Sequence, residues 1–288
     1  DARITDDSVK EIPLKKIFWT LSLTVAAFLG NVAGATAETC RAPDNIASVS
    51  GTAHCLAIKT FVPDTAADTL VIALHGDLSS GGPADYIFKV ARRAADLGAV
   101  GVAMIRPGYT GDNRTSSGTA SRDQNRADIY RAGQTDSMAA AVANLKKHHS
   151  AARIVLVGHS GGAAIAGVML GRSAPLVDAV LLISCPCDVR KWRDARNRKP
   201  LENAESPIDY LKTAPKSAQI FVLTGARDRN TFPWLGKDYA VKAKSMGLSA
   251  EFVEIPDAGH GFGRLSRQPQ IFDALKKVAD PDAALGCL

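Results

Sequence analysis

The segment that most restricts how this chain can fold is a short apolar run followed at once by small residues. Residues 154–157 read Ile-Val-Leu-Val, which has the length and branching of a strand buried in a parallel sheet. Gly-His-Ser-Gly-Gly follows at 158–162, and residues 163–170 then have the composition of a helix. Strand, sharp turn and helix are the context in which Gly-X-Ser-X-Gly presents a reactive serine. Because the short pattern is common by chance, it predicts a strained, reactive Ser160 only if partner residues follow elsewhere.

Strand and helix patterns alternate along the rest of the chain. Apolar or alternating runs predict strands in two pieces of 46–62 and at 69–74, 100–105, 177–184, 219–223 and 250–255. Amphipathic patterns predict helices at 85–97, 128–148, 239–246 and 270–278, with a long polar loop at 111–125 and an irregular basic connection at 185–214. The alternation predicts a single α/β domain, with a mainly parallel central sheet, helices on both faces and ligands at the carboxyl ends of the strands.

Three residues with complementary chemistry follow predicted strands, in the order Ser160, Asp228 and His260. A serine hydroxyl is a weak nucleophile and needs a base, and an unperturbed imidazole, which titrates near pH ~6.5, suits that task. A carboxylate would hold the imidazole tautomer and stabilise the imidazolium. Asp257 and Asp188 are alternative acids. We prefer Asp228 because it lies at the end of a strand, as the geometry of a catalytic triad requires.

Acyl transfer also needs hydrogen-bond donors where negative charge develops on the substrate oxygen. We expect one donor to be the backbone N–H of Gly161, directly after the serine, and the other to be the N–H of Asp77 in the His-Gly-Asp loop after residues 69–74. His75 in that loop is expected to be a buried, hydrogen-bonded strut. His159 is a neighbour of the nucleophile and is not expected to act as a second base.

These motifs carry a resemblance. His-Gly at 75–76, Gly-His-Ser-Gly-Gly at 158–162, Gly-Ala-Arg-Asp at 225–228 and Gly-His-Gly-Phe at 259–262 resemble those of serine hydrolases of the α/β-hydrolase superfamily, over nearly all of residues 55–280. The closing portion is similar to catalytic domains of the prolyl oligopeptidase type and to small esterases related to them. The sequence contains no propeller domain and no Tyr directly after His-Gly, which favours an esterase within this resemblance. A serine nucleophile counts against dienelactone hydrolases and haloalkane dehalogenases.

The first 37 residues have the pattern of a secretory signal peptide. Two lysines at 15–16 precede an apolar run at 17–32, and Ala-Thr-Ala ends at Ala37. We expect cleavage after Ala37, which leaves the α/β-hydrolase domain at 38–288 in a secreted or periplasmic protein. The alternative is an uncleaved membrane anchor, since the apolar run is nearly long enough to span a bilayer.

All five cysteines follow the expected cleavage site, where an oxidising compartment permits disulfides. Cys40 and Cys55 are the first choice for a pair. Cys185 and Cys187 could form a small ring, or one of them could reach Cys287. At least one thiol stays unpaired unless it bonds between chains.

The net charge of +6 says little about partners, but residues 190–199 concentrate six Lys and Arg side chains around Trp192. This basic segment could bind an anionic substrate, a polyanion or a membrane surface, or it could be a solvated face with one aromatic anchor. No zinc spacing, dinucleotide or phosphate-loop fingerprint, or nucleic-acid module is recognisable. We therefore expect no cofactor, no metal and no nucleic-acid partner, and membrane contact only through an uncleaved leader. The oligomeric state is left open.

The sequence predicts a secreted or periplasmic serine hydrolase that cleaves a carboxylic ester through an acyl-enzyme. A prolyl oligopeptidase-like peptidase with the same residues is the first alternative, and a non-catalytic binding protein of this fold is the second. Specificity is expected to lie in residues 106–125, 190–199 and 232–234.

Overall fold

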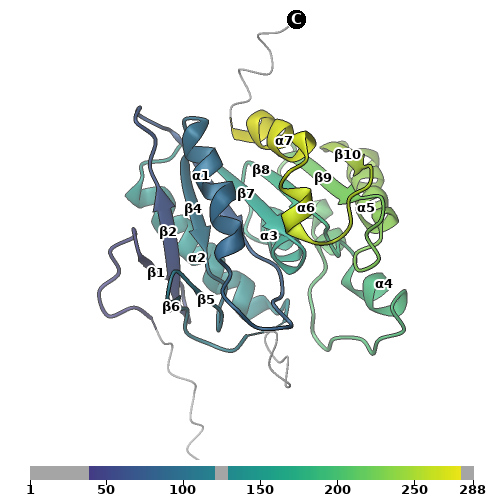
Figure 1. Cartoon of the computed structure of the whole chain (residues 1–288), viewed down its shortest axis with the longest axis horizontal. Helices are drawn as coiled ribbons and strands as arrows, with labels where there is room; N and C mark the ends of the chain where they lie inside the picture. Colours follow the sequence, from purple (N-terminus) through teal and green to yellow (C-terminus); the bar gives the residue numbers. More distant parts are fainter. Residues whose placement is uncertain (1–38, 121–128, 280–288) are drawn as a thin grey trace, which may run out of the picture. The chain divides into compact units, whose positions relative to one another are not determined.

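A central eight-stranded sheet dominates the computed structural model, which describes residues 39–120 and 129–279 (Figure 1). Its spatial order is β1-β2-β4-β3-β7-β8-β9-β10. The strands are β1 (Ser48–Ser50), β2 (Cys55–Phe61), β3 (Thr69–Leu74), β4 (Val100–Met104), β7 (Arg153–His159), β8 (Ala179–Ile183), β9 (Gln219–Gly225) and β10 (Ser249–Ile255). Strand β2 pairs antiparallel with both β1 and β4, whereas all pairs from β4 to β10 are parallel. The prediction of a mainly parallel sheet is confirmed.

Helices cover both faces of this sheet, as predicted (Figure 1). The side chains of β3 alternate between the faces, since Leu70, Ile72 and Leu74 join one core and Val71 and Ala73 join the other. The first core is closed by α2 (Ala132–His148), α3 (Gly161–Arg172) and α5 (Pro233–Ser245), and the second by α1 (Phe88–Asp96), α6 (Phe262–Leu265) and α7 (Pro269–Ala279). A buried sheet of this kind brings the carboxyl ends of its parallel strands to one edge.

Several short elements depart from the predictions. A hairpin of β5 (Thr110–Gly111) and β6 (Arg114–Thr115) overlaps the start of the loop expected at 111–125. Asp112 and Asn113 adopt the positive φ values of 50° and 58° that a tight hairpin turn needs. The irregular basic connection contains α4 (Val189–Asp194), with Asp188 accepting from the Lys191 amide at 3.1 Å, and the 3-10 turns η2 (Pro207–Asp209) and η3 (Leu211–Thr213). The helix expected at 239–246 begins earlier because Pro233 suits the first helical turn. The turn η1 (Asp85–Ile87) precedes α1.

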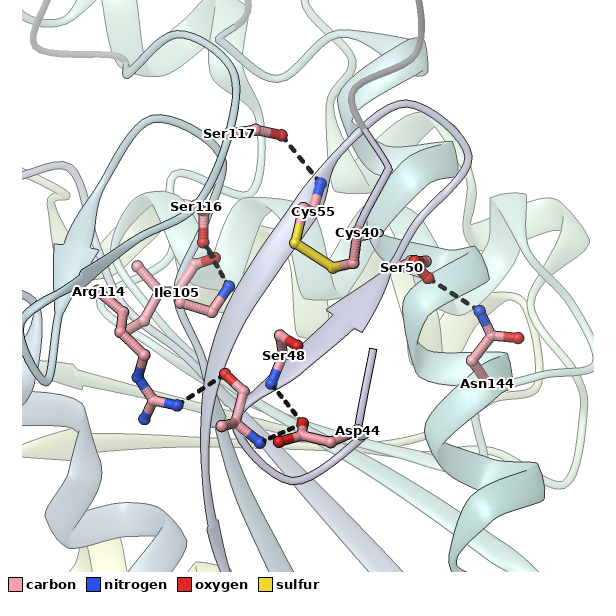
Figure 2. Close-up of a disulfide and its surroundings, with 12 residues drawn as sticks. Cys40, Asp44, Ser48, Ser50, Cys55, Ile105, Arg114, Ser116, Ser117 and Asn144 are labelled. Atoms are coloured by element: carbon pink, nitrogen blue, oxygen red, sulfur yellow. Dashed lines mark hydrogen bonds between the residues drawn. A yellow bond between two sulfur atoms is a disulfide. The ribbon is translucent and has the colours of Figure 1, made fainter. Parts of the chain in front are cut away.

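A disulfide links the segment before β1 to β2, at the antiparallel edge of the sheet (Figure 2). Cys40 bonds Cys55 at the start of β2, so the predicted pair is confirmed. The Asn144 amide of α2 donates to the Ser50 carbonyl at 2.8 Å, and the Cys55 amide donates to the Ser117 hydroxyl at 2.9 Å. Cys185 bonds Cys187. The leader at 1–37 and Cys287 lie outside the described residues. None of the described helices combines the length and hydropathy needed to cross a membrane.

Candidate active site

The turn between β7 and α3 holds Ser160 in a strained conformation. Its φ of 54° and ψ of −119° lie in a region that residues with a side chain rarely adopt. The flanking glycines make this turn possible, because a Cβ at Gly158 would lie 2.5 Å from the Ala163 Cα and one at Gly162 would lie 2.3 Å from the Leu74 carbonyl oxygen. The pattern at 158–162 therefore has the strand-turn-helix context that the sequence predicts.

Three loops at the carboxyl ends of β7, β9 and β10 bring Ser160, Asp228 and His260 together. The Nε2 atom of His260 lies 3.0 Å from the Ser160 Oγ, and its Nδ1 atom lies 2.9 Å from Oδ2 of Asp228. An ionised carboxylate only accepts, so Nδ1–H of His260 donates to it and Nε2 is left to accept from the serine hydroxyl. This is the arrangement in which an imidazole can remove the proton of the serine.

The Asp228 carboxylate is buried and fully engaged. Its Oδ1 atom accepts from the amides of Asn230 and Thr231 at 2.8 and 2.9 Å, and its Oδ2 atom accepts from the Thr231 hydroxyl at 2.9 Å. Burial alone raises a carboxyl pKa, but the hydrogen bond from His260 and these amides outweigh it and hold the pKa of Asp228 below its ordinary value. Asp228 is therefore a carboxylate at neutral pH. Thr231, which the sequence analysis missed, supplies two of these donors.

The rival acids are engaged elsewhere. Asp257 is exposed and forms an ion pair with Arg227, and Asp188 caps α4. His260 therefore bonds the acid that follows β9, and neither alternative.

The two residues expected to donate to the oxyanion lie against each other and against the serine. A Cβ at Gly76 would be only 2.9 Å from the Ser160 Cβ, so the loop after β3 approaches the nucleophile closely. A Cβ at Gly161 would be 2.3 Å from Oδ1 of Asp77. Gly161 begins α3, where backbone N–H groups have no partner within the helix. The loop of Asp77 and the start of α3 thus meet beside Ser160.

Two buried side chains hold Asp77, in contacts that the sequence did not predict. Arg106, which is fully buried, donates through Nη1 to Oδ1 of Asp77 at 2.8 Å and to the His75 carbonyl at 3.2 Å. The Tyr130 hydroxyl donates to Oδ2 of Asp77 at 2.7 Å. Burial and the adjacent Asp77 charge raise the pKa of Tyr130, so its hydroxyl stays protonated as a donor. Arg106 follows β4, and its place at a strand end is the only signal the sequence carries for it.

His75 has the role expected of it. It is fully buried, its Nδ1–H donates to the Gly76 carbonyl at 2.8 Å, and its Nε2 accepts from the Arg106 amide at 2.9 Å. Burial, and then the nearby Arg106 charge, lower the pKa of His75 to about 3. It is a neutral strut that joins the loops after β3 and β4.

The basic segment at 190–199 contacts the loop after β9, which carries Asp228. The indole N–H of Trp192 donates to the Asn230 carbonyl at 2.8 Å. Arg190 forms a bidentate ion pair with Asp209, with both hydrogen bonds at 2.8 Å. Arg190 and Lys191 are exposed, and each faces an acidic partner.

Across residues 39–120 and 129–279, no three His, Cys, Asp or Glu side chains gather as a metal site.

Comparison with known proteins assigns the family. Residues 93–277 match the prolyl oligopeptidase family. The chain belongs to that family. None of the curated proteins matches the sequence significantly.

Similar folds occur among esterases and peptidases. Est1E from Butyrivibrio proteoclasticus, solved with ferulic acid, has 15% identity and a TM-score of 0.62, with 80% of this chain and 96% of that chain covered. The Pyrococcus furiosus esterase Pf2001 has 17% identity and a TM-score of 0.62, with 80% and 89% covered. The Pyrococcus horikoshii acylaminoacyl peptidase has 14% identity and a TM-score of 0.61, and this chain covers 39% of it. The protein is a serine hydrolase with the α/β-hydrolase fold.

Proposed function

We propose that this serine hydrolase cleaves carboxylic esters through an acyl-enzyme on Ser160, with His260 as the base and Asp228 as the acid. The observation that carries the proposal is the continuous hydrogen-bonded path from the Ser160 hydroxyl through the His260 ring to the buried Asp228 carboxylate. The pKa of Asp228 is held below its ordinary value, so this acid is a carboxylate, and the serine hydroxyl faces a ring nitrogen of His260.

In the first half of the reaction, the Ser160 Oγ attacks the ester carbonyl carbon as its proton passes to Nε2 of His260. The carbonyl oxygen becomes an oxyanion, and in this proposal the N–H groups of Gly161 and Asp77 donate to it. The tetrahedral intermediate then expels the alcohol oxygen, which takes the proton from Nε2. The products of this half are a free alcohol and the acyl group bound to Ser160.

The second half repeats these steps with water. His260, again neutral, removes a proton from a water molecule that attacks the acyl carbon. Collapse of the second oxyanion breaks the bond to Oγ, and Nε2 returns its proton to Ser160. Asp228 stays ionised throughout and stabilises the imidazolium that forms twice per turnover.

The share of each known structure that this chain covers supports ester substrates over peptide substrates. The chain covers 96% and 89% of two esterase-type structures, but only 39% of an acylaminoacyl peptidase and 38% of a puromycin hydrolase. The shared region is therefore nearly all of the esterases and a part of the peptidases. Membership of the prolyl oligopeptidase family favours peptide hydrolysis as the second candidate.

A substrate panel separates these candidates. Nitrophenyl esters of increasing acyl length, measured beside aminoacyl and prolyl nitroanilides, should give kcat/KM values that favour the esters. Asp228→Asn should lower kcat by about 10⁴-fold, because the wrong imidazole tautomer would face the serine. Higher kcat/KM on the anilides would replace the esterase proposal with the peptidase one. Unchanged ester hydrolysis in the Asp228→Asn variant would contradict the triad.

We also propose that the protein acts outside the cytoplasm. The signal-peptide pattern before Ala37 and the disulfides Cys40–Cys55 and Cys185–Cys187 support an oxidising location. Expression of the chain with its leader should yield mature protein beginning at Glu38, as read by intact mass. Recovery of the uncleaved chain in a membrane fraction would favour the anchored alternative.

A further inference from the structure

A second path of hydrogen bonds runs behind the triad and takes no part in the reaction described above. The Gly76 amide donates to the Tyr86 hydroxyl oxygen at 2.6 Å. That hydroxyl lies 2.9 Å from Nδ1 of His159, and Nε2 of His159 lies 3.0 Å from the His260 carbonyl oxygen. The path joins the loop after β3, the residue before Ser160 and the backbone of His260.

Every proton on this path has one possible place. The His260 carbonyl only accepts, so Nε2 of His159 carries a hydrogen and donates. A neutral imidazole has one N–H, which leaves Nδ1 as an acceptor for the Tyr86 hydroxyl. Because that hydroxyl gives its hydrogen to Nδ1, its oxygen is free to accept from Gly76. The donors run without conflict from Gly76 through Tyr86 to His159 and on to His260.

The environment keeps His159 in the neutral form that this order requires. Burial, and then the charge of the nearby His260, lower the pKa of His159 to about 3. The His159 ring packs 5.3 Å from that of His260 and 5.1 Å from that of Phe262, and the Tyr86 ring packs 5.2 Å from Phe262. The positive charge of the reacting imidazole therefore stays on His260, beside Asp228.

The endpoints of the path are the two parts of the site whose placement catalysis depends on. Gly76 precedes Asp77, whose N–H is an expected oxyanion donor, and its Cα lies so near Ser160 that even a Cβ would meet the serine. His260 provides the base. A misplacement of about 1 Å in groups of this kind can cost up to about 10²-fold in rate.

We propose that Tyr86 and His159 are positioning residues, which hold the Gly76 amide and the His260 backbone at the separation that ester hydrolysis requires. This inference rests on the proposed function of Ser160 and His260. It gives the histidine of Gly-His-Ser-Gly-Gly a role distinct from that of a second base: it donates to the loop that carries the base.

Tyr86→Phe tests the proposal because it removes one hydroxyl and leaves the ring in place. The matched control is Tyr239→Phe, since Tyr239 is fully buried and its hydroxyl has no hydrogen-bond partner among the described residues. Kinetics on a nitrophenyl ester should be normalised to active sites titrated with a fluorophosphonate. We expect kcat of Tyr86→Phe to fall roughly tenfold with KM changed less than about twofold, and kcat of Tyr239→Phe to stay unchanged. Equal kcat in both variants would overturn the proposal.

His159 is tested by the tautomer of its ring in the wild-type protein and by a matched pair of variants. Nitrogen-15 NMR of histidine-labelled wild-type protein at pH 7, with signals assigned by comparison with His159→Gln, should show His159 neutral and protonated on Nε2. His159→Gln, whose amide nitrogen can reach the position of Nε2, should keep more of kcat than His159→Leu. Protonation of His159 on Nδ1 would overturn this inference alone. Hydrolysis that persists in Ser160→Ala would overturn both this inference and the proposed function.

Discussion

Replacing Arg106 with methionine removes the cationic half of a buried ion pair beside the nucleophile. Arg106 has no exposed side-chain surface and Asp77 has 13%, so solvent cannot replace the lost partner. The Asp77 carboxylate would keep only the Tyr130 hydroxyl of the two donors described above. The substitution therefore removes the cationic partner of a largely buried carboxylate in the loop that approaches Ser160.

The size of the effect follows from this burial. Breaking a buried pair by removing one partner typically costs about 3–5 kcal/mol. The Nε and Nη2 atoms of Arg106 are themselves buried without hydrogen-bond partners among the described residues, and methionine relieves that cost. We therefore expect the lower end, about 3 kcal/mol, which lowers Tm by roughly 6–12 °C for a domain of this size.

Urea and thermal unfolding followed by circular dichroism measure this loss. The matched control is Arg190→Met, because Arg190 pairs with Asp209 at the surface, where the two side chains are 58% and 45% exposed and such a pair contributes less than about 1 kcal/mol. Adding Asp77→Asn to Arg106→Met should recover part of the stability, since it removes the carboxylate charge that Arg106 no longer offsets. A loss below about 1 kcal/mol in Arg106→Met, or further destabilisation in the double variant, would refute the reasoning.

Two other predictions concern pH and the start of α3. The pKa values of buried His75 and His159 are both lowered to about 3, so their contribution to stability is complete above the unfolded pKa of about 6.5 and is lost as the pH falls toward 3. Unfolding titrations below pH 6 should show stability falling by up to about 3 kcal/mol per pH unit, and a flat profile between pH 6 and 4.5 would contradict the neutral assignment. Gly161→Ala should lower kcat by about 10- to 100-fold, because the new Cβ would lie 2.3 Å from Oδ1 of Asp77. Gly133→Ala, where nothing lies within 4 Å, is the control and should keep full activity.

Residues whose position follows from a strand end could be predicted from the sequence. The apolar runs before Ser160 and Asp228, and the strand pattern that ends shortly before His260, are local signals, and parallel strands bring such ends to one edge of a sheet. The fold class follows from the same alternation of patterns, and the Cys40–Cys55 pair follows from their positions at either end of a short segment.

Residues whose role depends on packing between distant elements could not be predicted. Tyr86 reaches His159 across 73 positions of the chain, and Arg106 reaches Asp77 across 29. Nothing around a single tyrosine or arginine indicates which loop it will face. Helix α4 was also missed, because its six residues are rich in Lys and Arg, and the burial of Val189, Trp192 and Arg193 becomes visible only in the fold.

The most direct test of the account is the chemical identity of the reactive residue. The folded protein should be labelled stoichiometrically by a fluorophosphonate, and mass spectrometry of the digested protein should place the label on Ser160. Ser160→Ala should abolish both the label and ester hydrolysis, while its thermal unfolding stays that of a folded protein. Labelling at another residue, or ester hydrolysis that continues in Ser160→Ala, would contradict the account.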